Sequence, residues 1–303
     1  MSVVEGVFMD LVEEVAPAKI NLILEVVGKY DNNYHKLETI MQSVDLCDRL
    51  KLFPGGSSIN LTVKGDCKVP DNSANLVWQA AEMMNKTFNR VPAGINIELN
   101  KNIPVSAGLG GGSSDAAAVI RALNRLFALD LSVRSMEELA LKLGSDVPFC
   151  IRGGTALARG RGEKLTFLPE PKLIYNSVLL IKPEFSVSTE EIFEKVPEKI
   201  FSQMTLTSKL VRLFLRGEKI EWTEGWKNDL EQITFALYPE LRQIKEEILS
   251  YDPRHVLMTG SGPTLMAFFQ GEDAEQTFID EWQGEGEIFK VQFLSSDVNN
   301  MVC

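Results

Sequence analysis

The sequence predicts an α+β protein with two domains. Three observations lead to this prediction: a strand-like alternation of apolar residues at 16–29, a glycine- and serine-rich run between a strand and a helix at 104–114, and a β-α-β-β-α-β order of elements after residue 170. A chain of 303 residues is long enough for two hydrophobic cores. We place the domains at 1–170 and 171–303, because the prolines on either side of Glu170 suggest a boundary.

The first element is a strand at 16–29, in which apolar residues occupy every second position. Its other face carries Lys19 and Asn21, which interrupt what could otherwise be a continuous apolar strand. The elements expected after it in the first domain are a strand at 59–63, a helix at about 75–88, a strand at 95–99, the glycine-rich run with its helix, a short helix from a capping box at 135–138 to Gly144, and a strand after the segment 145–151.

The second domain is expected to follow the ferredoxin-like order of elements. Its expected elements are a strand at 178–183, a helix opened by the capping box 188–191, helices at about 205–215 and 228–249, strands at 256–258 and 264–269, a helix at 273–283 and a strand at 288–294. The main strands and helices in this list form a split β-α-β unit, which packs helices on one face of an antiparallel sheet.

Composition and charge exclude several classes of protein. The net charge is −11 and no cluster of Lys and Arg is present, so we expect no nucleic-acid partner. No run of about 18 apolar residues is present, and the N-terminal residues 1–15 lack the basic region of a signal peptide. We therefore expect a cytoplasmic protein without a membrane partner, present as a monomer or weak homodimer.

The run PVSAGLGGGSSDAAAV at 104–119 predicts an anion site. Strand, glycine loop and helix bring bare backbone N–H groups and a helix N-terminus together, which favours a phosphate. A flexible linker or a tight helix entry is the alternative, but a linker would not lead directly into a helix with an apolar face. The residues expected to hold the phosphates are Pro104, Val105, Ser106, Ala107, Gly108, Leu109, Gly110, Gly111, Gly112, Ser113 and Ser114.

The two commonest phosphate motifs do not fit this run. A Walker A loop needs a lysine after its glycines, and none follows here. A dinucleotide-binding loop needs a third glycine where this chain has Ser113.

Three segments together resemble the signatures of the GHMP small-molecule kinases. They are APAKINL at 16–22, PVSAGLGGGSSDAA at 104–117 and LMTGSGPT at 257–264. Two more segments, YHKLET at 34–39 and LGSDVP at 143–148, are most similar to members that phosphorylate a cytidine diphosphate-linked polyol in non-mevalonate isoprenoid synthesis. The resemblance implies an ATP-binding first domain similar to ribosomal protein S5 domain 2, a ferredoxin-like second domain, and ATP and Mg²⁺ as cofactors, with no Mg²⁺ ligand assigned.

Lys19 and Asp146 are the expected catalytic residues. From the residues alone, Lys19 could be a solvated strand residue and Asp146 could cap the turn before Pro148. In the family that the chain resembles, the matching lysine contacts the reacting hydroxyl, the residue matching Asn21 contacts substrate, and the aspartate accepts or orients the hydroxyl proton. A cation there would favour alkoxide character in the nucleophile.

The resemblance also implies a cytosine site. The residues matching Tyr34 and Phe193 stack on the two faces of the base, the residue matching His35 binds its edge, and Thr189 lies near the same region. Without the resemblance, a Tyr-His dipeptide is more readily a structural pair. Aromatic stacking on a base contributes about 1–3 kcal/mol.

Four further basic or polar positions complete the expectations. Lys101 is expected to assist the ATP phosphates, although a surface strand end is a comparable interpretation, and Asn75 matches a position near the adenine or ribose. Arg159 and Arg161 are expected to be solvated loop charges. The alternatives to this function are a mevalonate or homoserine class GHMP kinase, or a nucleotide-binding regulator without activity.

Overall fold

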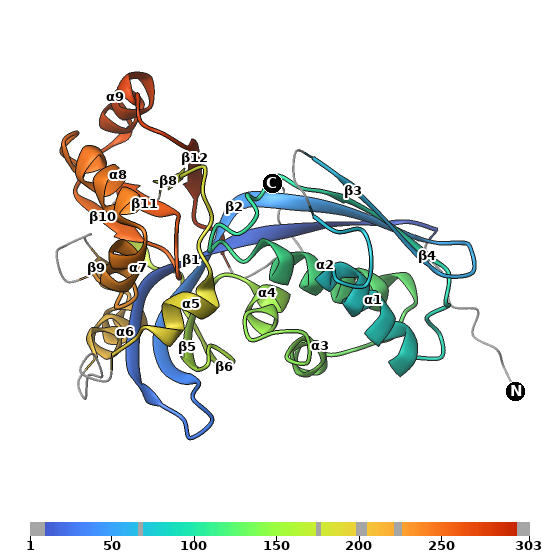
Figure 1. The fold of residues 1–303 in the computed structure, drawn as a ribbon. Helices are drawn as coiled ribbons and strands as arrows, with labels where there is room; N and C mark the ends of the chain where they lie inside the picture. The colour runs from blue at the N-terminus through green and yellow to red at the C-terminus, as the bar shows by residue number, and fades with distance from the viewer. Residues whose placement is uncertain (1–9, 66–68, 174–176, 198–204, 221–225, 296–303) are drawn as a thin grey trace, which may run out of the picture.

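The computed structural model describes residues 10–65, 69–173, 177–197, 205–220 and 226–295 (Figure 1). The first half of the chain forms one sheet and four helices. The strands are β1 (Val12–Lys29), β2 (His35–Pro54), β3 (Ile59–Lys64), β4 (Ile95–Asn100), β5 (Thr155–Gly160) and β6 (Lys164–Leu168). The helices are α1 (Leu76–Thr87), α2 (Gly111–Leu126), α3 (Val133–Ala140) and α4 (Val147–Arg152).

The four helices cover one face of this sheet (Figure 1). The strand order is β3-β4-β2-β5-β6, and β1 pairs with β2. The alanine-rich helix α2 is buried along most of its length, because small side chains let it pack closely against the sheet and against α1 and α4.

The second half forms the ferredoxin-like sheet that the element order predicts. The elements are β7 (Lys172–Leu173), β8 (Ser177–Lys182), α5 (Thr189–Glu194), α6 (Leu206–Arg216), β9 (Lys219–Ile220), α7 (Glu231–Leu237), α8 (Pro239–Leu249), β10 (His255–Met258), β11 (Leu265–Phe268), α9 (Glu272–Glu281) and β12 (Glu287–Gln292). The order β10-β11-β8-β12 is antiparallel throughout, which confirms the predicted α+β class.

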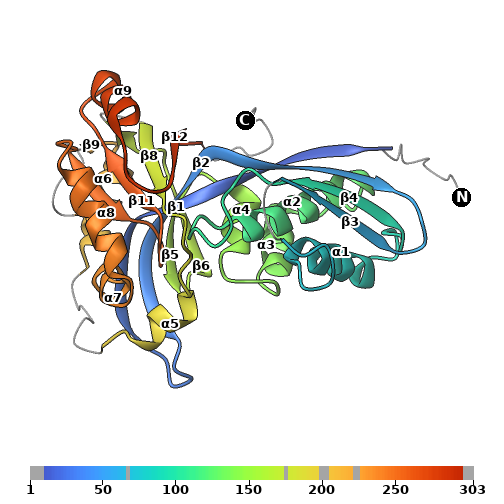
Figure 2. The same ribbon diagram turned by 45° about the horizontal axis from the view of Figure 1, so that its top comes forward.

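The long pair of β1 and β2 joins the two halves (Figure 2). The pair extends from Val12 opposite Leu52 to Lys29 opposite His35. Side chains of β1 such as Leu22 share a hydrophobic cluster with residues of the second sheet such as Met266. Strand β1 therefore contributes to the packing of both halves of the molecule. The domain boundary at residue 170 stays a prediction.

The structure corrects several predicted elements. The strand β2 was not predicted at all. Helix α3 begins after Ser132, whose hydroxyl accepts a hydrogen bond from the Ser135 N–H, so the predicted box at 135–138 is not the cap, and the helix ends at Ala140 rather than near Gly144. The segment expected only to lead into β5 forms helix α4. The predicted helix at 228–249 is two helices, because Pro239 begins a second one.

None of the described helices combines the length and apolar character that crossing a membrane requires. Residues 1–9, part of the segment in which no signal peptide is expected, lie outside the described residues. The cytoplasmic location and the oligomeric state stay predictions.

We expect His255 to make the protein less stable as the pH falls below 7. Burial, with the charge of Lys245 adding to it, lowers the pKa of His255 from 6.5 to about 4. Between these values the unfolded chain binds a proton that the folded chain does not, so protons favour unfolding. The free energy of unfolding should fall by about 2 kcal/mol from pH 7.5 to 5 through this group. Urea titrations of wild type and His255→Gln at both pH values measure it, and an equal pH dependence in both proteins would contradict it.

Candidate active site

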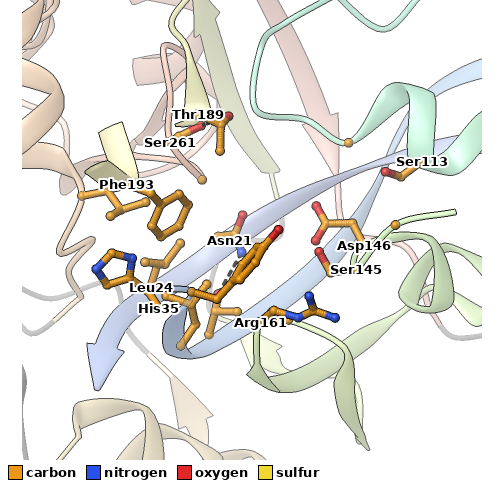
Figure 3. Close-up of a pocket in the computed structure, with 18 of the residues that line it drawn as sticks. Asn21, Leu24, His35, Ser113, Ser145, Asp146, Arg161, Thr189, Phe193 and Ser261 are labelled. Atoms are coloured by element: carbon orange, nitrogen blue, oxygen red, sulfur yellow. Dashed lines mark hydrogen bonds between the residues drawn. The ribbon is translucent and has the colours of Figure 1, made fainter. Parts of the chain in front are cut away.

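A cavity of about 1200 Å³ lies between the glycine-rich loop, the β1–β2 pair, the loop before α4 and helix α5 (Figure 3). Both halves of the chain contribute to it. The predicted site residues that line it are Lys19, Asn21, Tyr34, His35, Gly108, Gly110, Ser113, Asp146, Thr189 and Phe193. Segments separated by more than 170 residues therefore meet at one place.

Lys19 and Asp146 lie at one end of this cavity. The Lys19 Nζ atom is 3.5 Å from Asp146 Oδ2 and 2.8 Å from Asn21 Oδ1. The lysine side chain is 7% exposed, whereas that of Asp146 is 31% exposed, so the carboxylate can reach a bound molecule. A buried cation beside a solvent-accessible carboxylate is suited to hold and deprotonate a hydroxyl group.

The orientation of Asn21 follows from its neighbours. The Thr39 hydroxyl donates to the Ile23 carbonyl at 2.6 Å and accepts a hydrogen bond from Asn21 Nδ2 at 2.8 Å. The side-chain oxygen Oδ1 of Asn21 must then face Lys19. Because Asn21 and Thr39 are also almost completely buried, the lysine ammonium is held in a single position.

The glycine-rich loop packs directly against Lys19. The Lys19 N–H donates to the Leu109 carbonyl at 2.9 Å, and helix α2 begins immediately after Gly110. Gly110 has φ of +70°, and a Cβ atom there would lie 2.8 Å from Cγ of Lys19. The N-terminus of a 16-residue helix therefore faces the same cavity as Lys19 and Asp146, and a phosphate placed there would meet backbone N–H groups.

We expect Gly110→Ala to lower kcat/KM by about 100-fold, because the added methyl group must displace the Lys19 side chain. The left-handed backbone adds a cost of about 1–2 kcal/mol. Steady-state kinetics and thermal unfolding separate the two effects. Gly28→Ala is the matched control, since its Cβ would meet only ordinary contacts. Unchanged kinetics in Gly110→Ala would contradict the close packing of loop and lysine.

Aromatic side chains form the other end of the cavity. His35 stacks on Phe193 with ring centroids 5.6 Å apart, and Tyr34 is 56% exposed. The guanidinium of Arg161 lies over the Tyr34 ring, 5.0 Å from its centroid. Burial, with a smaller contribution from the charge of Lys29, lowers the pKa of His35, so its imidazole is neutral near pH 7. A neutral imidazole has one donor and one acceptor for the edge of a base.

The third signature segment closes the cavity from the second domain. The Ser261 hydroxyl is 2.7 Å from the Thr189 hydroxyl, and both residues line the cavity. The Thr264 hydroxyl donates to the Ala107 carbonyl at 2.7 Å, which ties the segment to the glycine-rich loop. Ser188 caps α5 through the Glu191 N–H, as its capping box predicts, and so helps to orient Phe193.

Lys101 and Asn75 do not line the cavity. The Lys101 side chain is buried and forms ion pairs with Asp48 and with Asp115 of α2. Asn75 is the N-cap of α1, where its Oδ1 accepts from the Val77 N–H at 2.9 Å. Their predicted contacts to ATP stay predictions. The remaining loop residues outside the cavity lining are Pro104, Val105, Ser106, Ala107, Leu109, Gly111, Gly112 and Ser114.

Sequence reasoning missed several residues of the cavity, among them Arg161. Arg161 is exposed in the turn after β5, as expected of a solvated loop charge, but it also lines the cavity and its guanidinium lies over the Tyr34 ring. The expectation is wrong for Arg159, which lies in strand β5 rather than in a loop and pairs with Glu38 at 2.8 Å; it does not line the cavity. The sequence could have distinguished the two arginines only through the end of the strand at Gly160, which leaves Arg159 in the strand and Arg161 in the turn.

Comparisons with known proteins show the family of the chain. The model of the GHMP kinases N terminal domain matches residues 75–154, and that of the GHMP kinases C terminal domain matches residues 215–288. A 4-diphosphocytidyl-2-C-methyl-D-erythritol kinase of Geobacillus sp. (strain WCH70) is 39% identical over 280 residues, covering 92% of this chain and 96% of that protein. The chain belongs to the GHMP kinase family. It lies in the 4-diphosphocytidyl-2-C-methyl-D-erythritol kinase group of that family.

One further relative and two solved structures extend the comparison. The kinase of that name from Macrococcus caseolyticus (strain JCSC5402) is 38% identical, with 94% of this chain and 100% of the relative covered. A crystal structure of 4-(cytidine 5'-diphospho)-2C-methyl-D-erythritol kinase aligns with a TM-score of 0.77 at 32% identity, over 93% of this chain and 99% of that one. A homoserine kinase from Cytophaga hutchinsonii, at 19% identity and a TM-score of 0.71 over 98% and 99% of the two chains, shares the GHMP kinase fold.

Proposed function

We propose that the protein transfers the γ-phosphoryl group of ATP to the 2-hydroxyl of 4-diphosphocytidyl-2-C-methyl-D-erythritol, giving the 2-phosphate and ADP in the non-mevalonate isoprenoid pathway. The observation that carries this proposal is one cavity with a lysine–aspartate pair at one end and stacked aromatic side chains at the other. The names of relatives at about 40% identity support the same substrate.

In this mechanism the substrate hydroxyl lies between Lys19 and Asp146. The Lys19 ammonium stabilises negative charge on the hydroxyl oxygen, and Asp146 accepts or orients its proton. The hydroxyl oxygen forms a bond to the γ-phosphorus as the bond to the β-phosphate oxygen breaks, which releases ADP. Most of the rate enhancement then comes from positioning and charge neutralisation, as is general in phosphoryl transfer.

The glycine-rich loop is proposed to bind the ATP phosphates, and Mg²⁺ is proposed as a further cofactor. Mg²⁺ in kinases is commonly bound through one or two protein oxygens plus substrate phosphates, and it neutralises phosphate charge. Among the described residues, no three acidic, His or Cys side chains form a cage for a metal ion. A metal ion held chiefly by the nucleotide would find the Asp146 carboxylate and the Ser113 hydroxyl among the oxygens that line the cavity.

One assay separates the proposed function from its alternatives. ADP release is measured with the cytidylyl substrate, mevalonate and homoserine presented separately. We expect turnover with the cytidylyl substrate alone. Turnover only with mevalonate or homoserine would reject the substrate assignment. ATP binding without turnover of any of the three would favour a regulator.

A further inference from the structure

The mechanism gives a role to Lys19 and leaves the other cations of the cavity open. The basic residues that line it are Lys19, Lys29, Lys142 and Arg161. A cytidine diphosphate-linked substrate carries a negatively charged diphosphate between its base and its reacting hydroxyl. The protein has a net charge of −11, so its overall field does not attract such a group, and a local cation is needed.

Arg161 lies between the two ends of the cavity. Its guanidinium covers the Tyr34 ring at the aromatic end. The next residue, Gly162, lies against the other end, where a Cβ atom would be 3.6 Å from Asp146 Oδ1 and 4.0 Å from Ser145 Cβ. Figure 3 shows Arg161 on the same side as Ser145 and Asp146, with His35 and Phe193 opposite. This position matches that of a linker between a base and a hydroxyl.

The other cations have different positions or partners. Lys19 is committed to Asn21 and Asp146 at the hydroxyl end. Lys29 of β1 lies opposite His35 of β2 in the strand register, so it lies at the base end of the cavity. Lys142 and Arg161 are both exposed, but among the described residues only Arg161 lies over an aromatic ring of the cavity. Arg161 is therefore the cation best placed for the group in the middle.

The chemistry of Arg161 suits a diphosphate. A guanidinium that covers an aromatic face keeps its in-plane N–H donors available, and these donors match two phosphate oxygens. None of the ion pairs formed among the described residues uses the Arg161 side chain, whereas Arg159, two residues earlier, pairs with Glu38. The charge of Arg161 is thus available to a ligand.

We propose that Arg161 binds the diphosphate of the substrate and so sets its position between the base site and the catalytic pair. The inference rests on the proposed function for the identity of the substrate. It makes Arg161 a specificity residue for cytidine phosphates over cytidine, distinct from the aromatic residues that contact the base.

The test measures binding of cytidine and of CDP to wild type, Arg161→Gln and Arg161→Lys by isothermal titration calorimetry. Arg161→Gln should weaken CDP binding by about 10- to 100-fold and cytidine binding by less than about threefold. The CDP affinity of Arg161→Lys should lie between those of wild type and Arg161→Gln, because lysine keeps the charge but not the forked N–H donors of the guanidinium. Arg159→Gln is the matched control and should bind both ligands as wild type does.

Kinetics with the complete substrate provide a second measurement. Arg161→Gln should raise the KM for the cytidylyl substrate by about 10- to 100-fold and leave the KM for ATP unchanged. Equal weakening of cytidine and CDP would overturn the proposal, because Arg161 would then act only by holding Tyr34. CDP binding unchanged in Arg161→Gln, or no tighter than cytidine binding in wild type, would also overturn it. Selective loss of CDP binding with no turnover by wild type would reject the proposed function and leave this site in place.

Discussion

Replacing Asp146 by Asn should lower kcat by about 10²- to 10⁴-fold while ATP binding stays close to that of wild type. The amide keeps the shape of the side chain but cannot accept the hydroxyl proton, and it leaves Lys19 without its carboxylate partner. Lys19→Ala should have a comparable effect, because the hydroxyl then loses the only cation within 3.5 Å of Asp146 among the described ion pairs. Single-turnover rates and equilibrium ATP binding measure the two properties separately.

Matched controls make this result specific. Lys51 is half exposed and pairs with Glu13, and neither residue lines the cavity, so Lys51→Ala should turn over as wild type does. Glu137→Gln, on α3, serves as the carboxylate control, since Glu137 pairs with Arg152 outside the cavity lining. Near-normal turnover in Asp146→Asn or in Lys19→Ala would remove that residue from the mechanism. Loss of ATP binding together with turnover would indicate a structural role instead.

Lys101→Met should destabilise the protein by about 3–5 kcal/mol, because it leaves two buried carboxylates without their shared cation. The side chains of Lys101, Asp48 and Asp115 are 5%, 0% and 3% exposed. Burial, followed by the charge of Asp48, raises the pKa of Asp115 well above its usual range, and Lys101 counteracts this effect. Urea denaturation at pH 7 measures the loss of stability.

A double variant tests the cause of that loss. Asp48 also accepts hydrogen bonds from the N–H groups of Asn102 and Ile103, at 2.6 and 2.9 Å, and keeps these partners without the lysine. Lys101→Met combined with Asp115→Asn should therefore recover part of the stability, because it removes the carboxylate with fewer partners. A double variant less stable than Lys101→Met alone would contradict this account. The cluster supports the start of α2, so we also expect weaker ATP binding in Lys101→Met.

The parts of the fold that the sequence predicted depend on local patterns. Alternation at 16–29 predicted β1, and the order of elements after 170 predicted the ferredoxin-like sheet. Both predictions rest on the spacing of apolar residues, which recur every second position in strands and every three to four positions in helices. The strand β2 escaped prediction although it pairs with β1, β4 and β5. A central strand is specified by its neighbours as much as by its own sequence.

In the candidate site, too, some residues could be identified from local sequence patterns and others could not. Lys19 and Asn21 could be identified because two polar residues interrupt an apolar strand, and the glycine-rich run because it joins a strand to a helix. Arg161 could not, since a turn arginine that lines a cavity and one that faces solvent have the same local sequence. Only the fold brings it over Tyr34, which is 127 positions earlier in the chain.

The sequence by itself determined the kinds of chemical group present: a glycine-rich loop without a Walker lysine, a lysine on a polar strand face, an aspartate before α4 and a Tyr-His pair. The tertiary structure decided which of them act together. It placed Lys19 against Gly110 and Asp146, and it bound Lys101 between two buried aspartates outside the cavity. The physical reason is that charge and reach depend on neighbours in space, and β1 and β2 bring together residues that the sequence keeps far apart.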